Sequence, residues 1–95
     1  MDERRKEALK KHQQRLRTGI AVGHILPALR PVLTEVEYDQ VQAKESNTAM
    51  VDELINTLLT KANKDFDEFC KVLHRNKYRH WVTTFQKEIG ETIGR

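Results

Sequence analysis

Two side chains with metal-binding and nucleophilic chemistry, Cys70 and His74, lie four positions apart. On a helix this spacing places a thiol and an imidazole on one face, where they could supply two of the four ligands of a zinc ion. The remaining three histidines are scattered through the chain, so no further ligand is indicated. Because two ligands do not make a zinc site, we expect a buried structural cysteine beside an ordinary histidine, with no metal and no cofactor.

Other patterns of chemistry are equally weak. No Ser/His/Asp arrangement, glycine-rich phosphate loop or pair of inward carboxylates can be assembled from the sequence. The segment from Lys77 to Trp81 mixes bases with aromatic residues, which a single-stranded nucleic-acid site could use. Trp81 fits the core of a helical domain better than an exposed binding site, so we regard nucleic-acid binding only as an alternative. Because no catalytic pattern is present, we expect no catalytic residue.

The composition fits one small, highly charged domain. Of the 95 residues, 38% are hydrophobic and 33% are charged, which suits a single core, and we expect one domain spanning residues 1–95. No apolar run approaches the ~18 residues of a membrane span, and the charged start from Met1 to Arg5 lacks the apolar region of a signal peptide. With a single cysteine, these features predict a cytoplasmic protein without a membrane segment.

The charges are segregated along the chain although the net charge is only +3. Seven bases and one acid lie between Arg4 and Arg17, whereas the segment from Glu35 to Asp39 holds three acids and no base. The basic segment could be a docking surface or a solvated helix face, and the acids could be its partner surface or could match a helix dipole. Tyr38 lies between these acids and is a further candidate for the interface.

Apolar residues recur at helical spacing in six short segments, and no period-two alternation indicates a strand. The first predicted helix runs from Asp2 to about Ile20, and the third begins at Thr34. The apolar stripes of the other four run from Val22 to Leu29, Val51 to Leu59, Phe66 to Leu73 and Trp81 to Ile89. Pro27 lies inside the second stripe, so this helix is either kinked or begins later than its stripe.

Several boundaries and burial assignments follow from the residue types. Thr34 is a predicted N-cap, with Val36 and Val41 facing inward and Tyr38 partly exposed. Any one of three neighbouring polar residues, Ser46, Asn47 and Thr48, could cap the fourth helix. Asn63 either ends the fourth helix or caps the fifth.

The order of these elements resembles a caspase recruitment domain (CARD) of the death-fold superfamily. The resemblance rests on Leu9 and Leu16 in a charged first helix and on four later motifs. These motifs are Val32-Leu33-Thr34-x-x-x-Tyr38-x-x-Val41, Leu54-Ile55-x-x-Leu58-Leu59, Phe66-x-x-Phe69-x-x-x-Leu73 and Tyr78-x-x-Trp81. The resemblance covers Asp2 to about Ile89. Within the family, the chain is similar to the domains of initiator caspases and of apoptosome or inflammasome platform proteins. The resemblance implies an all-α, six-helix antiparallel bundle that binds other CARD-containing proteins, with self-association expected.

In the family, a basic surface on the first and fourth helices meets an acidic surface on the second and third helices of a neighbour. The resemblance therefore implies two surfaces of candidate partner-binding residues. The basic surface on the first helix consists of Lys10, Lys11, Arg15 and Arg17, and the acidic surface on the third consists of Glu35, Glu37 and Asp39. Two features depart from the pattern: the fourth helix offers Asp52 and Glu53 where relatives often carry arginine, and the second has no acid and ends in Arg30. The alternatives are a small nucleic-acid-binding domain that uses the first helix and a purely structural helical domain of a larger protein.

Overall fold

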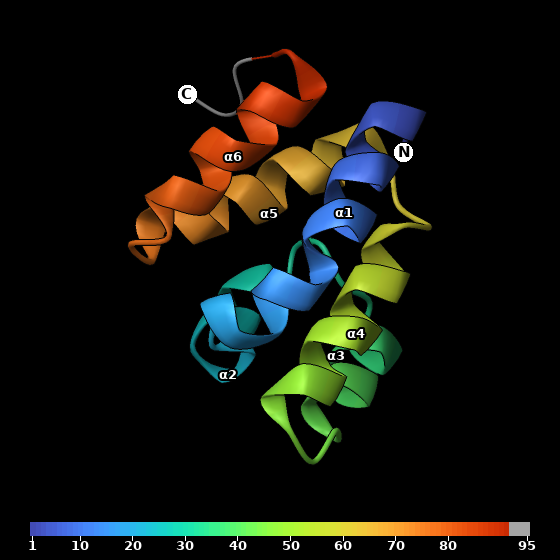
Figure 1. Ribbon diagram of the computed structural model, residues 1–95. Helices are drawn as coiled ribbons and strands as arrows, with labels where there is room; N and C mark the ends of the chain where they lie inside the picture. The colour runs from blue at the N-terminus through green and yellow to red at the C-terminus, as the bar shows by residue number, and fades with distance from the viewer. Residues whose placement is uncertain (92–95) are drawn as a thin grey trace.

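The computed structural model describes residues 1–91 and contains, within them, six α-helices and one 3-10 turn (Figure 1). The elements are α1 (Glu3–Gly19), α2 (Val22–Ile25), η1 (Leu26–Leu29), α3 (Glu35–Gln42), α4 (Asn47–Leu58), α5 (Asn63–Arg75) and α6 (Arg79–Ile89). α1 packs against both α4 and α6, α5 packs against α6, and α3 packs against α4. The predicted all-α fold of six helices is confirmed for the described residues. No described helix is long and apolar enough to span a membrane.

Side chains at the helix starts satisfy backbone amides that have no partner within the helix. Thr34 and Glu37 form the reciprocal pair of a capping box, with Thr34 Oγ1 accepting from the Glu37 amide at 3.2 Å, which confirms the predicted cap. Ser46 is the residue that caps α4. Asn63 is neither of the predicted alternatives, because it is the first residue of α5 and Ala62 precedes it at the N-cap position.

The second segment is short because proline interrupts it. α2 has four residues and then tightens into η1, with Pro27 near the start of the 3-10 turn, where its missing amide costs no hydrogen bond. Both halves bury their apolar side chains, and Val22, Ile25 and Leu29 are fully enclosed. The predicted stripe is correct, and the break that Pro27 predicts takes the form of a change in helix type.

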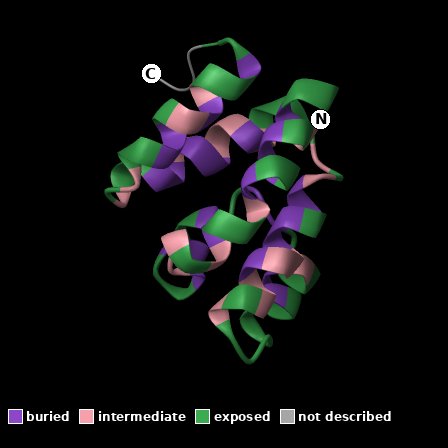
Figure 2. Cartoon of the chain, viewed as in Figure 1, coloured by how far each residue is buried: buried purple, intermediate pink, exposed green. Residues whose placement is uncertain are grey.

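One cluster of buried apolar side chains extends through all the elements (Figure 2). Phe66, Phe69 and Trp81, which the sequence places in the core, lie in this cluster. Two predictions for α3 are wrong: the side chain of Val36 is 66% exposed, and Tyr38, expected to be partly exposed, is only 6% exposed. Residues three or four apart share a helix face, so Tyr38 points inward together with Val41, and Val36 cannot share that face.

The connection between α5 and α6 holds a strained residue. Lys77 has a φ of 69°, in the left-handed region. The amide of Tyr78 donates to the carbonyl of Leu73 at 2.8 Å, and that of Lys77 donates to the carbonyl of His74 at 3.3 Å. These bonds form a Schellman motif, in which glycine is the usual residue at the position of Lys77. A side chain in this conformation costs about 1–2 kcal/mol.

Candidate interaction surfaces

Most of the basic side chains in α1 bind groups of this same chain. Arg4 donates to the carbonyl of Ile89, and ion pairs join Arg5 to Asp2, Lys6 to Glu3, Lys11 to Glu88 and Arg17 to Asp52. Within residues 1–91, only Lys10 and Arg15 of this basic segment are exposed and have no such partner. The free positive charge of α1 is therefore much smaller than the sequence indicates.

Arg5 is structural and does not belong to the surface. It is 6% exposed and its guanidinium lies 2.6 Å from Asp2, 3.3 Å from Glu91 and 3.8 Å from Asp67. The same guanidinium lies 5.7 Å from the centre of the Phe66 ring. Arg5 thus holds the start of α1 against α5 and against the residues that follow α6.

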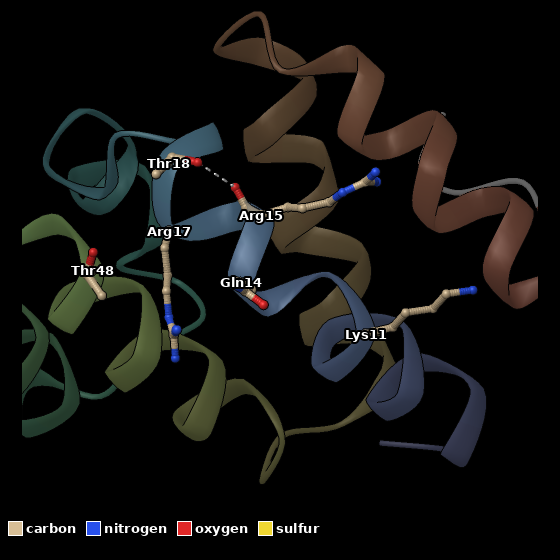
Figure 3. A pocket seen from close by; sticks show the side chains of 6 residues that line it. All are labelled: Lys11, Gln14, Arg15, Arg17, Thr18 and Thr48. Atoms are coloured by element: carbon tan, nitrogen blue, oxygen red, sulfur yellow. Dashed lines mark hydrogen bonds between the residues drawn. The ribbon is translucent and has the colours of Figure 1, made fainter.

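An open hollow of about 660 Å³ lies along α1 and the start of α4. Its lining residues are Lys11, Gln14, Arg15, Arg17, Thr18 and Thr48 (Figure 3). Figure 3 shows that Lys11 and Arg15 extend toward the side of α6, whereas Arg17 points in the other direction, over α4. Because the cations diverge and the hollow is open, it lacks the enclosed form and convergent polar groups of a small-molecule site.

The carboxylate of Asp52 neutralises the edge of α1 that faces α4. Its Oδ1 atom accepts from Nε of Arg17 at 2.8 Å and from Nε2 of Gln13 at 2.9 Å, and these bonds lower the pKa of the Asp52 carboxyl. The neighbouring Glu53 lies 3.5 Å from Nζ of Lys44. The two acids that depart from the family pattern are thus engaged within the chain.

Only some of the acids on α3 are paired within the chain, as is true of the bases on α1. Glu37 accepts from Nζ of Lys61 at 2.6 Å and takes part in the capping box, and the bond to Lys61 is the main cause that lowers the pKa of Glu37. Glu35 and Asp39 are exposed and make no ion pair within the described residues. We call Glu35 and Asp39 the acidic patch.

Tyr38 cannot be an exposed interface residue in this fold. Its ring is buried and lies under the guanidinium of Arg30, whose carbon is 4.0 Å from the ring centre. This stacking attaches the end of the second segment to α3 through a cation–π contact. Any role for Tyr38 in binding is therefore indirect, through the position of Arg30.

The turn between α5 and α6 carries a basic cluster that the sequence analysis did not select. Arg75, Lys77 and Arg79 are exposed there and form no ion pair within residues 1–91. We call these three residues the basic corner. The available signal was the absence of any acid between residues 69 and 87, which contain five lysines and arginines.

The candidate zinc ligands do not form a site. Cys70 is fully buried, and burial raises the pKa of its thiol well above the usual range, whereas His74 is exposed. Among the described residues, no three His, Cys, Asp or Glu side chains are grouped so that they could hold a metal ion.

A comparison with protein families matches residues 1–89 to the family described as Caspase recruitment domain. No curated protein and no solved structure matches the chain. The family match covers all six helices of the described structure, which confirms that the predicted six-helix bundle is of the death-fold type. The chain therefore belongs to the caspase recruitment domain family.

Proposed function

We propose that this domain assembles a signalling complex by binding caspase recruitment domains of other proteins and further copies of itself. Caspase recruitment domains are interaction modules that bind domains of their own family, so the partners are a caspase, an adaptor or a platform protein of apoptosis or inflammation. The domain spans residues 1–95 and acts in the cytoplasm. It contributes no catalysis itself and raises the local concentration of an effector such as a caspase.

The observation that supports this proposal is a pair of unsatisfied surfaces of opposite charge on different helices. Lys10 and Arg15 on α1 and the acidic patch of Glu35 and Asp39 on α3 have no ionic partner within residues 1–91. α1 and α3 both pack against α4. Each surface can meet its complement on a neighbouring molecule, and such head-to-tail contacts propagate from copy to copy.

The energetics favour assembly over a simple pair. A single exposed ion pair contributes about 0.2–1 kcal/mol, which is too little for a useful affinity. Several weak contacts repeated in a ring or filament bind much more tightly, because each added contact becomes effectively intramolecular. Apolar contacts at the centre of the interface can add to the affinity. Val36 is the only large apolar side chain exposed in the described structure, and it lies next to Glu35 in the sequence.

Charge reversal on each surface tests the proposal. We expect the double variant Lys10→Glu/Arg15→Glu to lose self-association in light scattering and to keep its helical circular-dichroism spectrum. Lys11 is left unchanged, because its ion pair with Glu88 contributes to the fold. The matched control reverses Lys64 and Lys87, two exposed lysines without ion pairs in the described structure.

A mixing experiment separates propagation from general charge effects. The variant Glu35→Gln/Asp39→Asn removes the charge of the acidic patch and retains the basic surface, and the α1 variant retains the acidic patch. Each variant alone should be monomeric, and an equimolar mixture should give a one-to-one dimer that grows no further. Association of the α1 variant at the wild-type level would contradict the proposed surfaces. A single-stranded oligonucleotide that binds wild type without any self-association would favour the nucleic-acid alternative.

A further inference from the structure

Of the two unpaired cations of α1, Arg15 faces α6 rather than α4. On the α4 side, the guanidinium of Arg17 is held by Asp52. On the α6 side, Arg15 is exposed and unpaired within residues 1–91, and it extends toward α6 (Figure 3). Side chains two positions apart on a helix point in roughly opposite directions, so Arg15 and Arg17 lie on opposite edges of α1. The edge that remains positively charged is the one beside α6.

The α5–α6 turn, which carries the basic corner, is fastened to the end of α1. The backbone amide of Ala21, just past α1, donates to the hydroxyl of Tyr78 at 3.1 Å. The ring of Trp81 lies so close to Gly19 that a Cβ there would meet Cζ2 at 2.8 Å. These contacts bring the basic corner next to the C-terminal turn of α1, one turn beyond Arg15.

The basic corner is suited to an acidic partner. Its three cations lie within five positions of one another, and no Asp or Glu lies between residues 69 and 87 to neutralise them. Lys77 also occupies a left-handed position where glycine would be less strained. Its side chain makes no hydrogen bond or ion pair within residues 1–91 that would offset this strain. The Schellman hydrogen bonds fix the backbone of Lys77, and its unpaired ammonium group is exposed between Arg75 and Arg79.

We infer that Arg15 and the basic corner of Arg75, Lys77 and Arg79 together form the basic docking surface of this chain, in place of the first- and fourth-helix surface of its family. The occupant is the acidic patch of a second copy, Glu35 and Asp39 on α3. This inference rests on the proposed self-association and names the surface that carries it. Lys10 then contributes at the rim, and α4 contributes no cation.

Charge complementarity within the chain supports a second copy as the occupant. The acidic patch is exposed and unpaired, as the basic corner is, so each surface has the charge that the other lacks. In Figure 1 the α5–α6 turn lies at one side of the molecule, well apart from α3, so the two surfaces do not meet within one molecule. The contact is therefore head-to-tail and leads to an open chain or a ring.

The first experiment compares Arg75→Glu/Arg79→Glu with Lys64→Glu/Lys87→Glu, which changes the net charge by the same amount. Lys64 lies at the opposite end of α5 from Arg75. We expect the corner variant to associate about tenfold more weakly than wild type in sedimentation velocity, since exposed pairs are lost and replaced by repulsions. The control should associate almost as wild type does.

Two further variants make the test specific. Lys77→Gly should raise the melting temperature by relieving strain and should weaken association, which a merely structural role would not do. Adding Glu35→Arg/Asp39→Arg to the corner variant exchanges the two charges and should restore association.

The outcomes separate this inference from the proposed function. If wild type associates and the corner variant matches its control, the inference is wrong and self-association stands. If wild type remains monomeric at high concentration, both this inference and the proposed self-association are wrong. If the charge exchange fails to restore association, and the basic corner instead binds a single-stranded oligonucleotide with a steep salt dependence, a second copy is the wrong occupant.

Discussion

Replacing Asp52 with asparagine tests whether α4 weakens assembly by neutralising α1. In the wild type, Oδ1 of Asp52 accepts from both Arg17 and Gln13, at 2.8 and 2.9 Å. Asparagine has nearly the same size and keeps an amide oxygen at Oδ1, so both hydrogen bonds can persist while the negative charge is lost. The change therefore isolates the charge of Asp52 from its packing.

The exposure of the pair sets the size of the effect. The side chains of Arg17 and Asp52 are 37% and 34% exposed, so their attraction is screened and contributes about 0.2–1 kcal/mol to stability. We expect the melting temperature to fall by no more than about 4–8 °C, the shift that 1 kcal/mol gives in a domain of this size. With the carboxylate gone, the positive charge of Arg17 is no longer neutralised, so it can attract the acidic patch of a neighbouring molecule from outside the docking surface while its hydrogen bond to position 52 persists. Association should therefore become about two- to fivefold tighter.

Sedimentation equilibrium on Asp52→Asn and Glu53→Gln measures this directly. Glu53 is on the same helix and pairs with Lys44 at 3.5 Å, so its replacement removes one negative charge without releasing a cation on α1. We expect Asp52→Asn alone to tighten association. Equal effects of the two variants would show that only net charge matters, and an unchanged Asp52→Asn would refute the idea that Asp52 withholds Arg17 from assembly.

The remaining predictions concern the fold. Leu58 is 0% exposed, so replacing it with alanine should lower the free energy of unfolding by about 2–5 kcal/mol. Urea unfolding measures this change, and an unchanged midpoint would refute the burial of Leu58. Gly19→Ala should destabilise by about 1–3 kcal/mol because the new Cβ meets Trp81 at 2.8 Å, whereas Gly23→Ala, with open space around it, should be neutral or stabilising in thermal melts. The lowered pKa of Glu37 means that its ionised form stabilises the fold above pH 4.5, its ordinary value, and that this contribution is lost as the pH falls through its folded value. The difference in stability between wild type and Glu37→Gln should therefore shrink from pH 6 to pH 3, and a constant difference would contradict the assigned ion pair.

The sequence predicts the helices well because each buried face is a local pattern. The dense stripe around Leu54 and Leu58 and the aromatic spacing of Phe66 and Phe69 fix which side of α4 and α5 turns inward. The buried face of the short α3 is harder to predict, because its eight residues give only a weak apolar pattern. There the sequence favours Val36 as the buried residue, but the larger apolar area of the Tyr38 ring determines how the helix is turned.

The interaction surfaces are less accessible to sequence reasoning, because charge pairing is not local. Lys11 and Arg17 are neutralised by residues 77 and 35 positions away, and no sequence spacing reveals such pairs. The local signals that do exist concern the acids of α3 and the acid-free stretch around the basic corner. Sequence alone therefore finds where charges are concentrated, and the fold determines which of them remain free.

Light scattering coupled to size-exclusion chromatography, at low and high salt, tests the central claim most directly. The account predicts oligomers of the wild-type domain that grow with concentration at low salt and dissociate as salt screens the charged surfaces. Negative-stain microscopy of the large fraction should show rings or filaments. A domain that remains monomeric at high concentration, whatever the salt, would contradict self-association through these surfaces.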